Sequence, residues 1–375
     1  MAFKRVLINL PFKIFYFYTM EFLLDKFKYR WVKVMKLFTA LLLASPSLVL
    51  AQTQKEKPAV TYEELYDEPY SINKLFIGFQ PLYGEVFATN VNAGFGIEGS
   101  YYQKDKFDVK ASFRKTYSSE FFDQNRQLAT KNNNVSDKPQ SFAYYEVGGT
   151  YHIKDFDQDS KTKMVLYKKS LKGDRWAATV PLHAEIPCKV RKIYGARLGG
   201  ILWSSTADLN RALSKQGLTN ANLVTSTGTK LPDNYTDING QVNQFNVFGN
   251  IHSADVYVGG SMTWIRNVAV SFDKYDEGMD DGMLTTFFDI LIAPSVKLDP
   301  VTYLGDKYST TALKTHSLGF RAGIDGKFNR TFGWAYGGEL GYRPSLVGQG
   351  FYAMFKISFP LYSTNLDYKV ESFGK

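Results

Sequence analysis

The sequence has 375 residues, of which 16% are aromatic and 30 are glycine, and its mean hydropathy is only −0.25. A membrane protein built from helices would be far more apolar, and a disordered chain would contain far fewer aromatic residues. The net charge of +9 lies mostly in residues 1–51, which hold eight Lys and Arg against two acids, so the remainder gives no support to a nucleic-acid-binding groove.

Residues 35–51 have the features of a secretory leader, with a charged start, an apolar core and small residues before a junction. We expect cleavage after Ala51, Met35 as the true start, and residues 1–34 as an upstream extension. In the alternative interpretation, residues 6–24 form an inner-membrane helix, although Pro and charged residues interrupt that run.

The mature chain is expected to contain one large domain between two tails. Residues 52–73 are acidic and are interpreted as a periplasmic tail, or alternatively as a plug that folds into the domain. Residues 74–362 are the expected domain, and residues 363–375 a C-terminal tail.

Period-two alternation recurs through residues 74–362 and predicts half-buried β-strands. In residues 350–361, for example, Phe351, Phe355 and Phe359 share one face, while Lys356 lies on the other. Because no stretch of this domain approaches 18 consecutive apolar residues, it would enter a membrane only as strands. The predicted strands are residues 74–83, 91–102, 106–117, 142–154, 161–169, 175–186, 190–204, 254–272, 283–296, 313–328, 331–343 and 349–362.

These twelve strands predict a closed all-β, transmembrane antiparallel barrel, with fourteen strands as the alternative if a further pair lies within residues 205–253. The lengths of the connections provide an independent test, since outer-membrane barrels have short periplasmic turns and longer outer loops. The three longest connections are residues 118–141, 205–253 and 297–312, which are the third, seventh and ninth in order. All three are odd-numbered and therefore belong to the same, outer end. The eighth, residues 273–282, is longer than a periplasmic turn should be.

The polar faces of the predicted strands carry interleaved charges of both signs. They are expected to line the lumen, either as a network of salt bridges that fills it or as a polar pathway for a small solute. The predicted lumen-lining residues are Glu98, Asp108, Lys110, Arg114, Glu146, His152, His183, Glu185, Arg197, Arg321, Asp325, Lys327, Glu339 and Arg343.

No catalytic or metal-binding motif stands out. The four histidines are not part of an H-E-x-x-H pattern, no G-x-S-x-G elbow is present, and the single cysteine excludes a Cys-rich metal site. We expect no catalytic residues, no metal and no cofactor, and we expect the protein not to be an enzyme. A barrel hydrolase remains an alternative that no motif supports.

The leader, the alternating Gly and aromatic strands and the spacing of the loops together resemble the Gram-negative outer-membrane β-barrel (porin-like) superfamily. The resemblance is architectural and covers nearly all of residues 74–362. It implies the outer membrane as location and porin-like passage of small solutes as function. The alternative is a non-conducting structural or accessory subunit of an envelope complex for secretion or assembly. The expected partners are outer-membrane lipid and other envelope proteins or further copies of the chain, and not nucleic acid.

Overall fold

The computed structural model describes residues 60–72, 74–88, 90–103, 106–118, 127, 129, 139–166, 182–236, 239–329 and 334–364. All of them belong to one compact unit, Val60–Lys375. The predicted leader and the upstream extension lie outside the described residues, as does most of the C-terminal tail.

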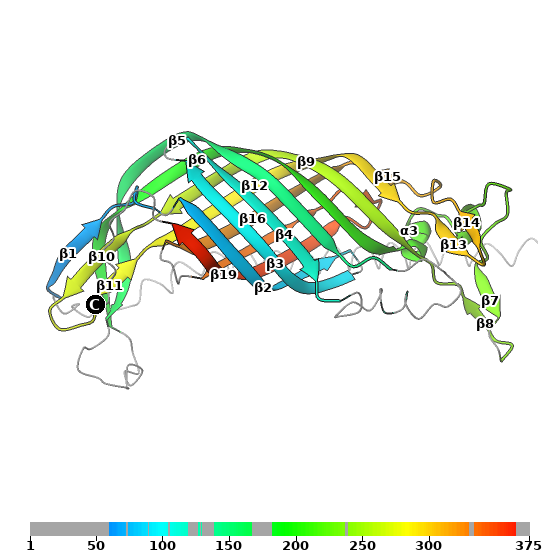
Figure 1. The fold of residues 1–375 in the computed structure, drawn as a ribbon, viewed down its shortest axis with the longest axis horizontal. Coiled ribbons are helices and arrows are strands. Elements are labelled where there is room, and N and C mark those ends of the chain that lie inside the picture. The colour runs from blue at the N-terminus through cyan, green and yellow to red at the C-terminus, as the bar shows by residue number, and fades with distance from the viewer. Residues whose placement is uncertain are drawn as a thin grey trace, which may run out of the picture. The chain divides into compact units, whose positions relative to one another are not determined.

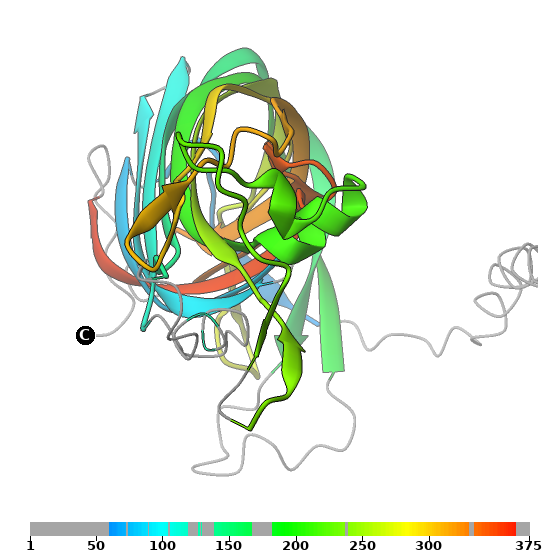
Figure 2. The ribbon, with the colours of Figure 1, turned by 90° about the vertical axis from the view of Figure 1, so that its right-hand side faces the viewer.

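Ten antiparallel strands close into a barrel (Figures 1 and 2). Each strand pairs with the barrel strands before and after it in the chain, and the last pairs with the first. The strands are β2 (Leu75–Phe87), β3 (Asn90–Gln103), β4 (Phe107–Thr116), β5 (Ala143–Leu166), β6 (Leu182–Asp208), β9 (Phe248–Ile265), β12 (Gly282–Leu298), β16 (Leu318–Phe328), β17 (Ala335–Tyr342) and β19 (Phe351–Thr364). The predicted fold class is confirmed.

The predicted count of twelve strands is wrong, and so is the alternative of fourteen. The described parts of the predicted strands 142–154 and 161–169 belong largely to one strand, β5, and those of 175–186 and 190–204 belong to one strand, β6. Residues 167–169 and 175–181 lie outside the described residues. The charged run between the first two of these predicted strands is typical of a turn but continues the pairing, with Asp157 opposite Arg191. Pro187 is also typical of a break. Proline has no N–H to donate to a neighbouring strand, so it is tolerated at a strand edge. Pro187 lies before Arg191, where pairing with β9 begins, so β6 pairs only with β5 at this position.

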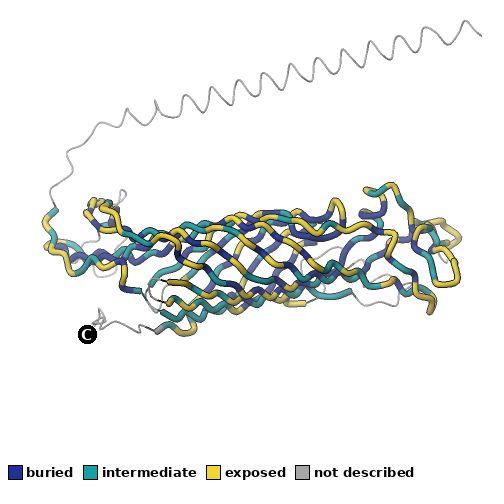
Figure 3. Tube along the Cα trace, turned by 90° about the horizontal axis from the view of Figure 1, so that it is seen from above, coloured by how far each residue is buried: buried dark blue, intermediate teal, exposed yellow. Residues whose placement is uncertain are grey.

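The outer wall of the barrel is apolar. Val147, Leu198 and Leu340 are each more than half exposed, while the residues beside them in the strands are buried or half-buried. Exposed and buried positions alternate along the barrel strands (Figure 3). Period-two geometry thus places apolar groups where lipid would contact the wall. The closed ring of strand pairs gives each barrel strand hydrogen-bonding neighbours on both sides. Among the described residues, no helix is both long and apolar enough to cross a bilayer.

We expect a charge on this wall to destabilise the barrel in lipid. Val147→Arg, near the middle of the barrel part of β5, should lower the free energy of unfolding by about 2 kcal/mol, because arginine is costly at the bilayer midplane. Urea titration in lipid vesicles measures this. The control is Val242→Arg in a loop hairpin, where valine is also exposed and no loss is expected. Equal effects of the two substitutions would contradict a lipid-facing wall.

At one end of the barrel, called here the sheet end, β1 (Tyr62–Asp67), β10 (Val268–Phe272) and β11 (Gly278–Asp280) form a three-stranded sheet. The described part of the predicted tail therefore contains the strand β1, paired with β10. The predicted strand 254–272 divides into β9 and β10. Apolar side chains of the long β5–β6 hairpin, including Met164 and Ile186, pack in one cluster with those of β10. Hence the sheet end has a small protein core of its own.

The opposite end, called the loop end, carries all three of the longest connections, as predicted from their odd positions. The connection after β6 contains α3 (Leu209–Lys215), η1 (Asn220–Asn222) and the hairpin β7–β8 (Asn234–Thr236, Val242–Gln244). The side chain of Asp208 caps α3 by accepting a hydrogen bond of 3.0 Å from the backbone N–H of Arg211. The shorter pairs here are β13–β14 (Val301–Tyr303, Asp306–Tyr308) and β15–β18 (Thr315–His316, Ser345–Leu346).

Candidate functional site

Arg321 occupies the centre of the barrel interior. Its guanidinium donates hydrogen bonds to Glu146 Oε1 at 2.6 Å, to Asp289 Oδ2 at 2.9 Å and to the hydroxyl of Tyr144 at 3.1 Å. Arg197 Nε reaches the other oxygen of Asp289 at 2.9 Å. Each of these residues alternates along its strand with outward apolar neighbours, so the period that builds the wall also directs the charges inward.

A second pair completes this central network. Arg114 donates to Glu339 Oε1 at 3.4 Å, and Glu339 also lies 3.6 Å from Arg321. The side chains of Arg321 and Arg114 are each 1% exposed, and that of Asp289 is 0% exposed. A column of water through the barrel would leave these groups accessible, so the central network fills the cross-section. Buried charges of this kind are held only when they are paired and hydrogen-bonded.

Toward the loop end, Arg343 pairs with Glu85 at 2.8 Å and lies 4.1 Å from the ring centre of Tyr352. Other aromatic rings surround the same guanidinium, among them Trp203. Beyond this pair, Leu209 and Leu213 of α3 belong to one apolar cluster with interior residues of the barrel. Figure 2 views the molecule from this end, with α3 beside the barrel mouth. The loop end of the interior is thus closed by an apolar core.

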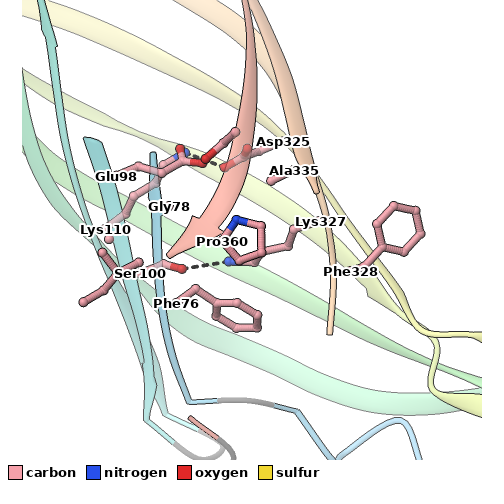
Figure 4. A pocket seen from close by; sticks show the side chains of 13 residues that line it. Phe76, Gly78, Glu98, Ser100, Lys110, Asp325, Lys327, Phe328, Ala335 and Pro360 are labelled. Carbon is pink, nitrogen blue, oxygen red and sulfur yellow. Dashed lines mark hydrogen bonds and ion pairs between the residues drawn. The ribbon is translucent and has the colours of Figure 1, made fainter. Parts of the chain in front are cut away.

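Toward the sheet end, lysines and carboxylates surround two small cavities, which we call together the chamber. Lys110 pairs with Asp325, and Lys356 bridges Glu98 and Asp325. The cavities measure about 40 and 30 Å³ and share lining residues, including Lys327. Figure 4 shows the side chains that line the larger of the two. Since a water needs about 10–15 Å³, the chamber has room for a few waters or one small group.

Twelve of the fourteen predicted lumen residues lie in the barrel interior, in the central network, in the Arg343 pair or around the chamber. Among them, His152 Nε2 lies 3.1 Å from Asp108 Oδ2 beside the chamber. Eleven of the twelve come from β3, β4, β5, β6, β16 and β17, and Arg343 directly follows β17. The structure therefore brings together charges that lie far apart in the sequence.

The prediction that His183 and Glu185 point inward is wrong, since both are exposed. They lie in the part of β6 that extends beyond the barrel, where Ala184 and Ile186 on the opposite face are buried against the sheet end. Within lipid the apolar face of a strand points outward, whereas in this extension it packs on protein and the polar face meets water. The polar face of a strand therefore points into the barrel within the membrane but points to water in the extension beyond it.

Interior charges that were missed from the sequence include Glu85, Asp255, Asp289 and Lys356. Each is a single charged residue on the polar face of an otherwise apolar strand segment. Asp289, for example, interrupts a run of Phe and Ile. Such an isolated charge was the available signal, because lipid would exclude it from the outer wall.

The remaining histidines offer no assembled metal site. His252 Nε2 lies 3.3 Å from Asp299 Oδ2, with both side chains about half exposed, and the ring centre of His316 lies 4.6 Å from that of Tyr342. Within the described ranges, no group of three His, Cys, Asp or Glu residues could hold a metal ion. The absence of catalysis stays a prediction.

No family model matches the chain, and none of the curated proteins compared with it matches either. Among solved structures, it matches a loop L8 deletion mutant of OmpT, an outer membrane protein of Vibrio cholerae. The two are 8% identical, the match covers 77% of this chain and 99% of that one, and the TM-score is 0.15. Similarity this low supports no argument about function. By its own strand pairing and apolar outer wall, the chain is a closed antiparallel β-barrel of the membrane-embedded type.

Proposed function

We propose that the protein is a non-conducting barrel of the Gram-negative outer membrane that acts as a structural or accessory subunit of an envelope complex. The observation that carries this proposal is the filled interior. The central network and the apolar core at the loop end occupy the space that a solute would need.

Porin-like passage of small solutes, the first function expected from the sequence, has less support. A solute would have to displace Arg321 from three partners at 2.6–3.1 Å, in a site too buried for bulk water to replace them. Opening such buried pairs costs several kcal/mol, which is too much for a pathway that should stand open.

The sheet end supports a role in an assembly. Its β1–β10–β11 sheet and the long β5–β6 hairpin extend the fold beyond the barrel wall and have their own apolar core. By the predicted topology this end faces the periplasm, where partner proteins of the envelope would meet it.

We expect the purified mature chain, starting at Gln52, to give no stable conductance steps in a planar bilayer. A porin inserted in the same bilayer is the positive control, and heat-modifiable migration on gels verifies that the barrel is folded. Chemical crosslinking in the native membrane should then yield specific envelope partners. Stable, reproducible single-channel steps from the folded chain would refute the proposal in favour of a channel.

A further inference from the structure

Lys327 differs from the other charged groups around the chamber. Among the described residues, no carboxylate lies within ion-pair distance of its ammonium, which donates a hydrogen bond of 2.8 Å to Ser100 Oγ. The ammonium also lies 4.4 Å from the ring centre of Phe76 and 4.6 Å from that of Tyr102. These rings attract the positive charge of the ammonium through cation–π interactions, but they carry no negative charge that would neutralise it.

The nearby carboxylates are held by other cations. Asp325 is bound by Lys110 and Lys356. Glu98 also binds Lys356 and accepts a hydrogen bond of 3.0 Å from Gln80. Within the described part of the chain, the ammonium of Lys327 therefore lies in a charged cluster without a paired anion of its own.

Open space lies beside this ammonium. The polar side of the cavity of about 40 Å³ includes Lys327, Ser100, Lys110 and the paired carboxylates Glu98 and Asp325, and its apolar side includes Phe76, Phe328 and Pro360 (Figure 4). This volume suits a group of a few heavy atoms, such as a carboxylate or a small phosphate.

The wall beside the cavity is irregular. Pro360 has no N–H to donate, and the pairing of β19 with β2 shifts register between Pro360 and Tyr362. These are the last and first strands of the barrel, so the irregularity lies at its closing seam.

We propose that this pocket binds a small oxyanion, a carboxylate or phosphate group, through the ammonium of Lys327 and the hydroxyl of Ser100. The apolar lining and the irregular seam would let an acyl chain on that group extend toward the wall. The oxyanion thus comes either from a free anion or from the head group of an amphiphile. This inference does not depend on whether the barrel conducts.

The test is calorimetric titration of the folded mature chain in neutral detergent with three probes: acetate, inorganic phosphate and laurate. We expect saturable binding of at least one probe at one site per chain. Binding of laurate alone identifies a membrane amphiphile as the source, and binding of acetate or phosphate identifies a free anion.

Lys327→Met should weaken that binding tenfold or more, because a charge-assisted hydrogen bond is lost while the side-chain length is nearly kept. Ser100→Ala should weaken it by a smaller factor and supplies a milder variant if the first fails to fold. Lys115→Met, which removes an exposed lysine of β4, is the control and should leave binding unchanged. The proposal would be overturned if none of the three probes bound saturably. It would also be overturned if Lys327→Met and Ser100→Ala both bound the probe as tightly as the unaltered protein.

Discussion

Arg321→Met is expected to lower the free energy of unfolding by about 3–5 kcal/mol, a loss at least as large as those expected for Gly199→Val and Val147→Arg. The methionine fills part of the same space but leaves Glu146 without its hydrogen-bonded cation and leaves Asp289 with Arg197 alone. Both carboxylates are buried, so water cannot take the place of the guanidinium. Urea titration of the refolded protein in lipid vesicles, followed by gel migration and by tryptophan fluorescence, measures the loss.

Two further variants test whether the loss of stability comes from breaking the buried ion pairs or from removing any arginine. Arg211→Met on α3, where the side chain is exposed, should change stability by less than about 0.5 kcal/mol. Adding Glu146→Gln to Arg321→Met removes one stranded charge and should recover more than about 1 kcal/mol. If the double variant were no more stable than Arg321→Met alone, the unpaired charge in the central network would not be the cause of the lost stability.

Gly199→Val is expected to destabilise the barrel by about 3 kcal/mol, at the upper end of overpacking effects. Gly199 faces Gly148 on the neighbouring strand, and the ring of Tyr257 rests in the space that the two leave. A Cβ at Gly199 would lie 2.5 Å from that ring and 2.6 Å from the Cα of Gly148. The strand pair must then open or the ring must move.

Movement of the Tyr257 ring would disturb the central network as well, because the guanidinium of Arg321 lies 4.4 Å from its centre. The control is Gly200→Ala, one residue further along β6, where a Cβ would meet only a backbone oxygen at 3.7 Å. Thermal and urea unfolding of both variants should show a loss for Gly199→Val alone. An equal loss at both positions would indicate that the strand needs glycine in general. It would contradict a specific requirement for space beside the ring of Tyr257.

The alternation of side chains in each strand could be predicted from the sequence because the period of two is a property of the extended backbone. It was enough to place Arg114, Glu146 and Arg321 inside the barrel and Val147 outside it. The positions of the long loops at one end followed for the same reason, since antiparallel neighbours return the chain to alternate ends.

The number of strands depended on the tertiary structure. Whether a charged run such as residues 155–160 turns or continues extended is decided by its partner, here residues 188–193 of β6. Local propensity cannot distinguish a turn from a polar strand that leaves the bilayer. For the same reason, the sequence could not show that His183 and Glu185 lie past the membrane boundary, where the apolar face packs on protein.

The sequence by itself determined the fold class and most of the inward charges, because both follow from local periodicity. Only the tertiary structure decided which charges meet. Arg321 on β16 contacts Glu146 on β5 and Asp289 on β12, because the tilt and register of the closed sheet set distances across the interior. The same geometry leaves Lys327 with a hydroxyl in place of a carboxylate among the described residues. Those distances depend on all ten strands together, so no single segment of the sequence encodes them.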